Sequence, residues 1–189
     1  KALNRAFDAV LVHSDPKLFK LEETFLRFDE IRIPIVYTGF IAQPSPPGAR
    51  KSVRMQLGLI DTQKLIVASA GGGSVGAALL KSVVDAFRRL SGGSDNHLHV
   101  YTGPYVSAKE FDSLRRKAGS RVFIGKFSTD FIFYMAAADL SISMGGYNTS
   151  MNLLACGVPA LVWPFGLNRE QRLRAQRPTD HRAQEAERR

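Results

Sequence analysis

The sequence contains a single cysteine, Cys156, among its 189 residues. No disulfide can therefore form within the chain, and we expect a reducing, cytoplasmic compartment. Long apolar runs are also missing: the longest one that no charged or polar residue, glycine or proline interrupts, Phe131–Ala138, is too short to cross a bilayer. No secretory signal pattern is visible. These absences favour an ordinary globular domain.

Several motifs of catalysis and metal binding are absent as well. The sequence has no Gly-Lys-Ser/Thr triplet, which argues against a nucleoside triphosphatase, and it has no HExxH motif. The histidines are scattered along the sequence. Only His97 and His99 share a strand face, and they lack an acidic or cysteine partner at the spacing of a metal site. We therefore expect neither a metal nor a cofactor.

Acidic residues are in the minority. The chain has 26 lysines and arginines against 17 aspartates and glutamates, which gives a formal net charge of +9. Nucleic acid is one partner that such an excess can indicate. However, the basic residues are scattered and are not interleaved with aromatic residues, so we expect no nucleic-acid groove. The positive charge would also suit a phosphorylated ligand or a peripheral contact with anionic lipid.

Short apolar runs alternate with helix-like segments along the sequence. Runs such as Phe7–Val12 and Leu65–Ala70 are apolar at almost every position, as in parallel strands that are buried on both faces. We therefore predict an α/β fold with an open, doubly wound, Rossmann-like parallel sheet. The predicted strands are 7–13, 31–37, 64–70, 97–102, 121–124, 139–143 and 159–162. The predicted helices are 17–28, 49–57, 75–90, 107–117, 129–138 and 147–156.

The sequence predicts three parts. Residues 1–30 are expected to end a preceding domain or to form an interdomain segment, and residues 31–175 to form the main domain. Residues 176–189 are expected to be a disordered basic tail, because they contain almost nothing apolar. Within the second part, Ala42–Gly48 is rich in proline and could be a hinge or linker.

The segment Ser141–Phe165 is the most informative part of the sequence. It reads as a strand, a glycine turn at Gly145 and Gly146, a helix, and a second short strand. The glycines allow a sharp turn and leave no side chain at the mouth of the helix. The first amides of a helix point outward with the positive end of the helix dipole behind them, which suits a phosphate.

A second glycine turn, Gly71–Gly76, also follows a predicted strand and opens a helix. Its spacing matches GxGxxG, but a dinucleotide site expects an acid at the end of the next strand, and that strand ends in Tyr101-Thr102-Gly103. A nicotinamide dinucleotide is therefore disfavoured, and a tight turn without a ligand is an alternative. In a doubly wound sheet both turns reach the same edge, where together they can hold a diphosphate.

Polar residues follow the last predicted strand, at Asn168-Arg169-Glu170-Gln171. Amide and carboxylate groups at such a place suit sugar hydroxyls, which need both donors and acceptors. The alternative is the beginning of a helix, with Asn168 as its cap and Glu170 in its first turn.

Together these motifs resemble the carboxy-terminal domain of the GT-B glycosyltransferases. The strongest match is MGGYNTSMNLLACGVPALVWPF at 144–165, followed by NREQRLRA at 168–175. Weaker matches are Tyr37–Gly39, Gly72–Gly76 and Met135–Asp139. The nearest group is glycosyltransferase family 28, which includes the UDP-N-acetylglucosamine transferase of peptidoglycan synthesis.

The resemblance implies that residues 31–175 bind a nucleoside-diphosphate sugar, UDP-linked in this family. The diphosphate would contact Gly73, Ser74, Gly145, Gly146, Tyr147, Asn148 and Thr149. The base or ribose would contact Phe127, Ser128 and Asn152, and the donor sugar would contact Glu170 and Gln171. The implied activity is transfer of a hexosyl group to an acceptor hydroxyl. Because the family carries its acceptor site and catalytic base on an amino-terminal domain, we assign no catalytic residue and expect donor binding without turnover.

The sequence departs from the family at Asn152, where a glutamate commonly grips the ribose hydroxyls. Asparagine still forms hydrogen bonds, but without the charge-assisted strength of a carboxylate. Two alternatives therefore stay open: a nucleotide-sugar hydrolase or epimerase on the same fold, and a degenerate binding module without activity. GT-B enzymes typically need no bound metal, in agreement with the absence of a DxD motif.

Overall fold

A computed structural model describes residues 2–72, 75–90 and 95–164 of the chain. The chain divides into two compact units, Lys1–Ala42 and Gln43–Arg189. The first unit contains α1 (Leu3–Ala6), β1 (Val10–Val12), the 3₁₀ helices η1 (Leu21–Glu23) and η2 (Phe28–Glu30), and β2 (Ile35–Tyr37). Its two strands pair in parallel. Within residues 2–42 only Ser14 is buried, so the hydrophobic core lies in the second unit.

The second unit is built on a five-stranded parallel sheet with the order β5-β4-β3-β6-β7. The strands are β3 (Leu65–Ser69), β4 (His97–Tyr101), β5 (Val122–Gly125), β6 (Leu140–Ser143) and β7 (Ala160–Val162). After β3 the chain builds outward through β4 to β5, and it then returns to the other side of β3 with β6. This reversal is the topological switch point of a doubly wound fold. The α/β class predicted from the sequence is therefore confirmed.

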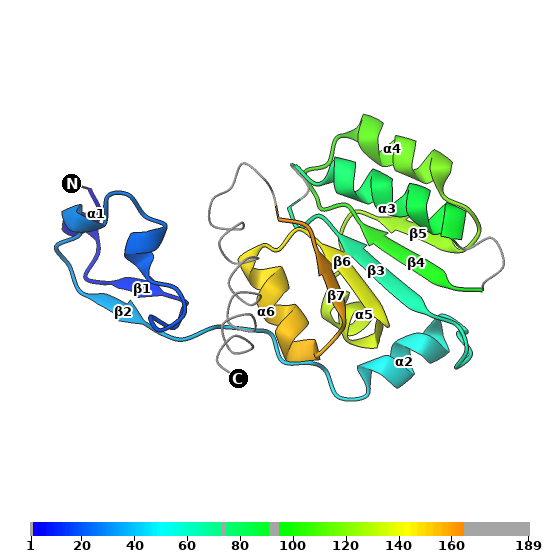
Figure 1. Cartoon of the computed structure of the whole chain (residues 1–189), viewed down its shortest axis with the longest axis horizontal. Helices are drawn as coiled ribbons and strands as arrows, with labels where there is room; N and C mark the ends of the chain where they lie inside the picture. The colour runs from blue at the N-terminus through cyan, green and yellow to red at the C-terminus, as the bar shows by residue number, and fades with distance from the viewer. Residues whose placement is uncertain (1, 73–74, 91–94, 165–189) are drawn as a thin grey trace, which may run out of the picture. The chain divides into compact units, whose positions relative to one another are not determined.

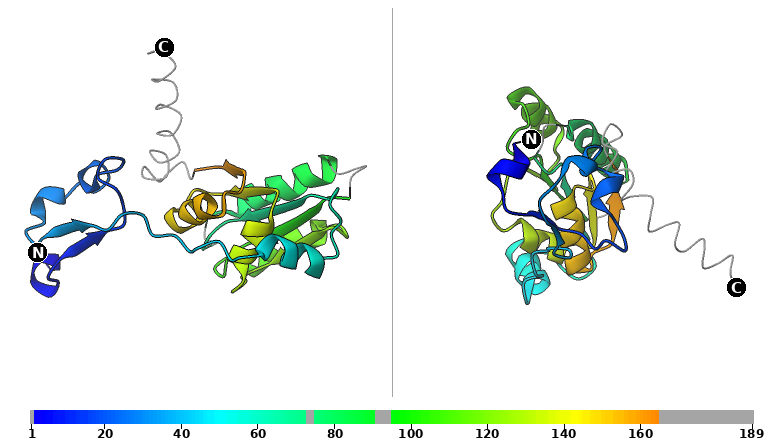
Figure 2. Two further views of the ribbon diagram at one scale, coloured as in Figure 1. Left: turned by 90° about the horizontal axis from the view of Figure 1, so that it is seen from below. Right: turned by 90° about the vertical axis from the view of Figure 1, so that its left-hand side faces the viewer.

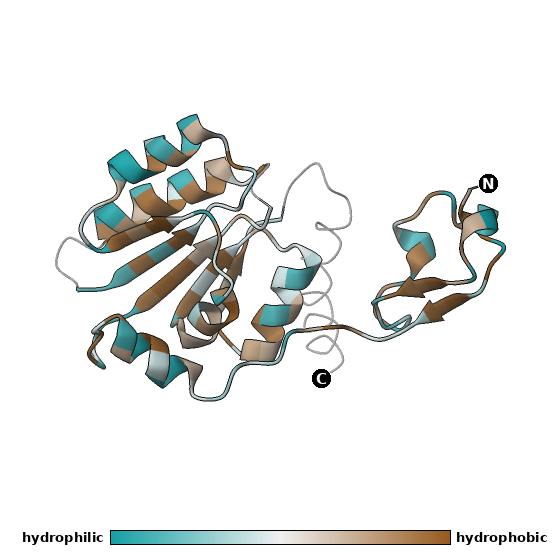
Figure 3. Cartoon of the chain, turned by 180° about the vertical axis from the view of Figure 1, so that it is seen from behind, coloured by the Kyte–Doolittle hydropathy of each residue, from teal (hydrophilic) through white to brown (hydrophobic). Residues whose placement is uncertain are grey.

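Helices cover both faces of this sheet. They are α2 (Ala49–Gln56), α3 (Ala77–Leu90), α4 (Ala108–Lys117), α5 (Phe131–Ala137) and α6 (Tyr147–Cys156). Figures 1 and 2 show α3 and α4 on one face, and α2, α5 and α6 on the other. In Figure 3 the strands are mostly hydrophobic, whereas α3 and α4 carry hydrophilic residues on their outer sides. None of the described helices is long and apolar enough to span a membrane.

The core has a layer on each side of the sheet. Between the sheet and α3, fully buried side chains such as Leu80, Val84 and Leu98 form the larger layer. On the opposite face, Leu65 and Val67 pack with Val53 of α2 and Ala137 of α5. Adjacent residues of β3 therefore serve opposite layers, which explains why nearly every position of this strand is apolar.

Two expectations differ from the structure in the first unit. The predicted helix at 17–28 is wrong, because this stretch forms turns and two short 3₁₀ helices. Leu18 and Phe25, two of its helix-spaced apolar residues, stay exposed, and most helical stability in proteins comes from packing such a face. The units divide between Ala42 and Gln43 rather than at residue 30, because β2 pairs with β1.

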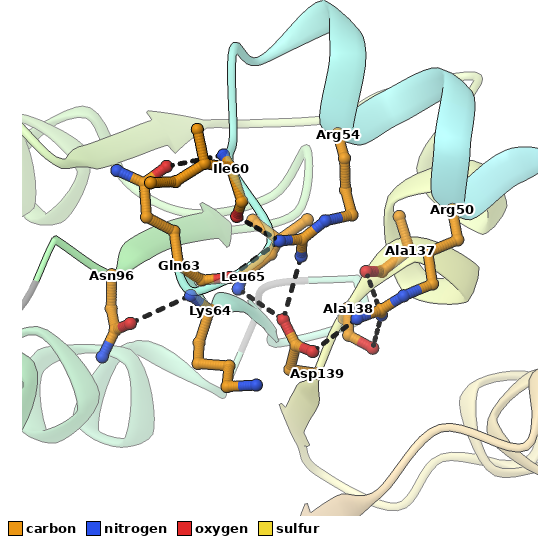
Figure 4. A network of polar contacts seen from close by, with 10 residues as sticks. All are labelled: Arg50, Arg54, Ile60, Gln63, Lys64, Leu65, Asn96, Ala137, Ala138 and Asp139. Carbon is orange, nitrogen blue, oxygen red and sulfur yellow. Dashed lines mark hydrogen bonds and ion pairs between the residues drawn. The ribbon is translucent and has the colours of Figure 1, made fainter.

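A partly buried polar network joins α2 to the centre of the sheet (Figure 4). The Asp139 carboxylate accepts hydrogen bonds from Arg50 (Nη2–Oδ1, 2.7 Å), Arg54 (Nη1–Oδ2, 3.2 Å) and the Leu65 backbone N–H (2.8 Å). The Asp139 N–H donates in return to the Leu65 carbonyl at 2.8 Å. Arg54 is itself buried and also donates to the Ile60 and Gln63 carbonyls. One carboxylate therefore connects α2, β3 and the beginning of β6.

This network predicts an acid-sensitive contribution to stability. Burial disfavours the charged carboxylate, but the hydrogen bonds from Arg50 and Leu65 and the nearby charges outweigh it and hold the pKa of Asp139 below its ordinary value. Asp139→Asn leaves Arg54 buried without its counter-ion, and should lower the free energy of unfolding by about 3 kcal/mol near neutral pH. Urea denaturation of both proteins, followed by circular dichroism, measures the difference.

The difference should shrink in acid. Because the folded pKa lies below the unfolded value of about 3.9, the carboxylate stabilises the protein above that value and loses this effect as the pH falls through the folded pKa. The exposed Asp61 provides the control, since Asp61→Asn should change stability by no more than about 0.5 kcal/mol. Equal effects of the two substitutions at neutral pH would contradict the role of Asp139.

Candidate functional site

A pocket of about 190 Å³ opens at the carboxyl end of the sheet. Its walls come from the ends of β3 and β4, the loop that follows β5, and the first turns of α5 and α6. The lining residues are Ser69, Gly71, Tyr101, Gly103, Lys126, Phe127, Ser128, Phe131, Asn148, Thr149 and Asn152. The pocket therefore lies beside the switch point between β3 and β6, where open α/β sheets bind ligands.

The N-terminus of α6 forms one wall of the pocket. Gly146 is its N-cap and makes no side-chain cap, and the helical hydrogen bonds begin with Ser150 N–H to the Gly146 carbonyl at 2.9 Å. The N–H groups of Asn148 and Thr149 precede that bond, so the helix itself does not use them. A Cβ added at Gly146 would meet nothing within 4 Å, which leaves open space in front of the helix.

Gly145 shapes the turn that delivers the chain to this helix. Its φ is +63°, a value that side chains rarely adopt, and an added Cβ would lie 2.7 Å from Cγ1 of Val162 on β7. Conformation and space therefore both require glycine here. The adjacent Gly146 has an ordinary φ of −64°, so its lack of a side chain opens the helix mouth and is not needed for the turn.

Buried serine hydroxyls lie at the strand ends behind the pocket. Ser69 is 5% exposed, lines the pocket, and has no hydrogen-bond partner for its Oγ. Its neighbour across the β3–β6 register, Ser143, is fully buried and also has an unpartnered Oγ. Buried hydroxyls without partners are costly in a folded protein. Ser69 therefore offers a polar group that a ligand or a bound water can satisfy.

The other side of the pocket is aromatic. Tyr101 and Phe131 meet edge to face with ring centroids 5.1 Å apart, and burial raises the pKa of the Tyr101 hydroxyl. Phe127 is 69% exposed, so a face of its ring is accessible. Lys126 is the only charged residue of the described lining, and its ammonium lies 5.2 Å from the centroid of the Phe111 ring. The pocket thus combines an aromatic end, a helix N-terminus and one cation.

Glycines in the turns after β3 and β4 bring backbone segments close together. A Cβ at Gly103, which has a φ of +84°, would collide with the backbone of Gly71 and Gly72. A Cβ at Gly76 would collide with Ala70, at the carboxyl end of β3. The turn after β3 is therefore packed tightly against the turn after β4 and against the beginning of α3.

The structure brings several predicted site residues together. Asn148, Thr149, Asn152, Phe127 and Ser128 line the pocket, and Gly145, Gly146 and Tyr147 form the adjoining turn and the beginning of α6. Gly73, Ser74, Glu170 and Gln171 lie outside the described residues.

Ser69, Gly71, Tyr101, Gly103, Lys126 and Phe131 also line the pocket but were not among the predicted site residues. Most of these residues end a strand or follow one closely, so their position in the sequence relative to the strands is the feature that could have identified them.

The turn after β3 also has the spacing Gly-x-Ser-x-Gly, from Gly72 to Gly76, which is found around the nucleophile of serine hydrolases. Such a serine needs a histidine base. Among the described histidines none lines the pocket. His99 is packed against the rings of Phe123 and Tyr134, and burial lowers its pKa to about 4. The described residues therefore supply no hydrolase base at this pocket.

Two comparisons with known proteins gave matches. Residues 67–187 match the glycosyltransferase family 28 C-terminal domain. Among solved structures, the chain is similar to the glycotransferase of kitacinnamycin, with 19% identity over 87% of this chain and a TM-score of 0.50. It is also similar to CalG4, the calicheamicin glycosyltransferase, with 16% identity over 82% of this chain and a TM-score of 0.49.

The chain spans 38% of the first of these structures and 34% of the second. At 19% identity, the likeness to the first is one of fold. A search of curated protein sequences gave no match.

The two glycines at the mouth of α6 should respond differently to the same substitution. Gly145→Ala places a side chain at positive φ and against Val162, and should lower the free energy of unfolding by roughly 1–3 kcal/mol. Gly146→Ala adds a methyl group in open space, and should cost less than half as much. Urea denaturation measures both. Equal losses would show that the turn does not depend on the conformation of Gly145.

Proposed function

Because the chain belongs to the glycosyltransferase family 28 C-terminal domain family, we propose that it binds the nucleoside-diphosphate sugar of a hexosyl transfer. The donor is a UDP-linked sugar, and the acceptor is a hydroxyl group. The second unit acts as the donor-binding half of a GT-B enzyme. The sequence left two alternatives open: a nucleotide-sugar hydrolase or epimerase, and a degenerate binding module. No observation at the described pocket favours either of them over donor binding.

One observation carries this proposal: the open N-terminus of α6 lies in the same pocket as the unpartnered hydroxyl of Ser69. Helix amides and the helix dipole attract a phosphate, and the absence of a side chain at Gly146 allows it to approach the backbone closely. Ser69 can donate to a phosphate oxygen, and in doing so its buried hydroxyl would gain the partner that it lacks. Lys126 supplies the one positive side chain of the described lining.

The other contacts of the donor are assigned by extending it from the mouth of α6 to the aromatic end of the pocket. We assign the diphosphate to Gly145, Gly146, Tyr147, Asn148 and Thr149 at the mouth of α6, and to Gly73 and Ser74 of the turn after β3. The base stacks on the accessible ring of Phe127 beside Ser128. Glu170 and Gln171 hold the hydroxyls of the donor sugar.

The chemistry required of this domain is leaving-group stabilisation. The acceptor oxygen attacks the anomeric carbon, the bond from that carbon to the diphosphate breaks, and the electron pair stays on the diphosphate. The amides of α6 oppose the negative charge that develops there, and they are already oriented before the reaction. The acceptor proton passes to a base in the other half of the enzyme.

Calorimetric titration of the chain with UDP tests the phosphate site. Gly146→Asp places a carboxylate at the mouth of α6, and should weaken UDP binding by about tenfold or more through repulsion and lost space. Gly119→Asp is the matched control, since an added side chain at this exposed glycine meets nothing within 4 Å. It should leave the affinity for UDP unchanged. Equal weakening by both substitutions, or no binding of UDP by the unaltered chain, would overturn the proposed site.

The chain alone should bind the donor without turning it over, because the acceptor site and the base are assigned to the other half of the enzyme. We expect no release of UDP from UDP-N-acetylglucosamine above the background rate in the presence of simple sugar acceptors, at concentrations that saturate binding. Release that is lost in Gly146→Asp would show that this half contains its own catalytic base.

A further inference from the structure

Asn152 occupies a particular position along the pocket. It follows Asn148 by four residues on α6, so the two side chains lie on the same face of the helix, about 6 Å apart along its axis. Both line the pocket, as does Phe127. A nucleotide with its diphosphate at the N-terminus of α6 and its base on Phe127 has its pentose between these two places. Asn152 therefore lies beside the pentose, an inference that rests on the proposed function.

The hydrogen-bond acceptor of Asn152 is already in use. Its Oδ1 accepts a hydrogen bond of 3.0 Å from the backbone N–H of Gln43. A backbone N–H can only donate, so the orientation of the amide is fixed by this contact and the Nδ2 group takes the other position. Asn152 consequently presents N–H donors to a ligand, and its one acceptor oxygen, already bonded to Gln43, has a single lone pair left.

No other residue of the described lining compensates for this. That lining contains no carboxylate, and the whole stretch from residue 140 to residue 164 has no charged side chain. A pentose 2′-hydroxyl gains most from a charged acceptor, because charge-assisted hydrogen bonds are about twice as strong as neutral ones. The described lining therefore offers that hydroxyl no charged acceptor.

We propose that Asn152, held by Gln43, makes the site nearly indifferent to the 2′-hydroxyl, so that ribo- and 2′-deoxyribonucleoside diphosphates bind with similar affinity. The site selects for diphosphate and base, and not for the pentose. The donor class is thereby widened from UDP-sugars to the corresponding 2′-deoxynucleotide sugars.

Calorimetric titration of the full chain with UDP and with 2′-deoxy-UDP tests this proposal. The two ligands differ only at the 2′ position. We expect their dissociation constants to differ by less than about tenfold, since a neutral hydrogen bond contributes no more than that.

Asn152→Asp provides the decisive variant. It keeps the size of the side chain, and one carboxylate oxygen can still accept from Gln43 while the second presents an acceptor where Nδ2 was. This variant should bind both ligands more weakly, because its charge repels the diphosphate, and should raise the preference for UDP by about tenfold. Asn152→Ala is the control: it removes the amide without adding a charge, and should leave the ratio of the two dissociation constants unchanged or bring it closer to one.

The outcomes separate this inference from the proposed function. If neither nucleotide binds, the proposed function itself is overturned. If UDP binds about tenfold or more tightly than 2′-deoxy-UDP to the unaltered chain, the phosphate site stands and the inference about Asn152 is wrong. If Asn152→Asp binds but leaves the ratio unchanged, Asn152 does not face the pentose, and the inference is again wrong.

Discussion

The ion-paired carboxylate of Asp139 holds together the two strands on which the pocket depends. The return of the chain from β5 to the far side of β3 is a long crossover, and β6 must be placed next to β3 for the switch point to exist. Asp139 exchanges two hydrogen bonds with Leu65 at the beginning of these strands, and Arg50 and Arg54 fasten α2 over the same place. A charge that is partly removed from water requires such partners, so the network favours this pairing over alternative ones.

The carboxyl ends of β3 and β6 form the part of the sheet that lies beside the pocket. With the register set by pairing, Ser69 meets Ser143, and the chain leaves β6 directly into the turn at Gly145. The stretch from residue 140 to residue 164 then provides a helix N-terminus, small residues and no formal charge. An anion at this place would therefore be held chiefly by backbone amides, with Lys126 as the one cation of the described lining. Fixed dipoles of this kind need little reorganisation when charge develops on a leaving group.

Local patterns predicted much of the second unit. The apolar runs of β3 and β4 and the segment from the glycine turn to Cys156 were assigned correctly, because burial on both faces and the glycines leave clear marks in the sequence. Helix spacing at 17–28 was misleading, because spacing alone does not show whether a face finds a partner. Asn148, Thr149 and Phe127 were expected near one site, whereas Ser69 and Tyr101 became visible only with the sheet order. The bond between Gln43 and Asn152 joins residues 109 positions apart, which no local pattern reveals.

The turn at Gly145 shows how the edge of the sheet shapes the candidate site. Val162 is the partner of Ser143 in the β6–β7 register, and its Cγ1 occupies the space that a side chain at Gly145 would need. The Trp163 N–H extends this pairing to the Ser143 carbonyl at 2.8 Å. Strand β7 therefore closes one side of the turn, and the chain enters α6 through a positive φ at Gly145 followed by the extended Gly146. Strand pairing thus decides which residue type the turn accepts, so Val162 on β7 constrains the helix mouth although it does not line the pocket.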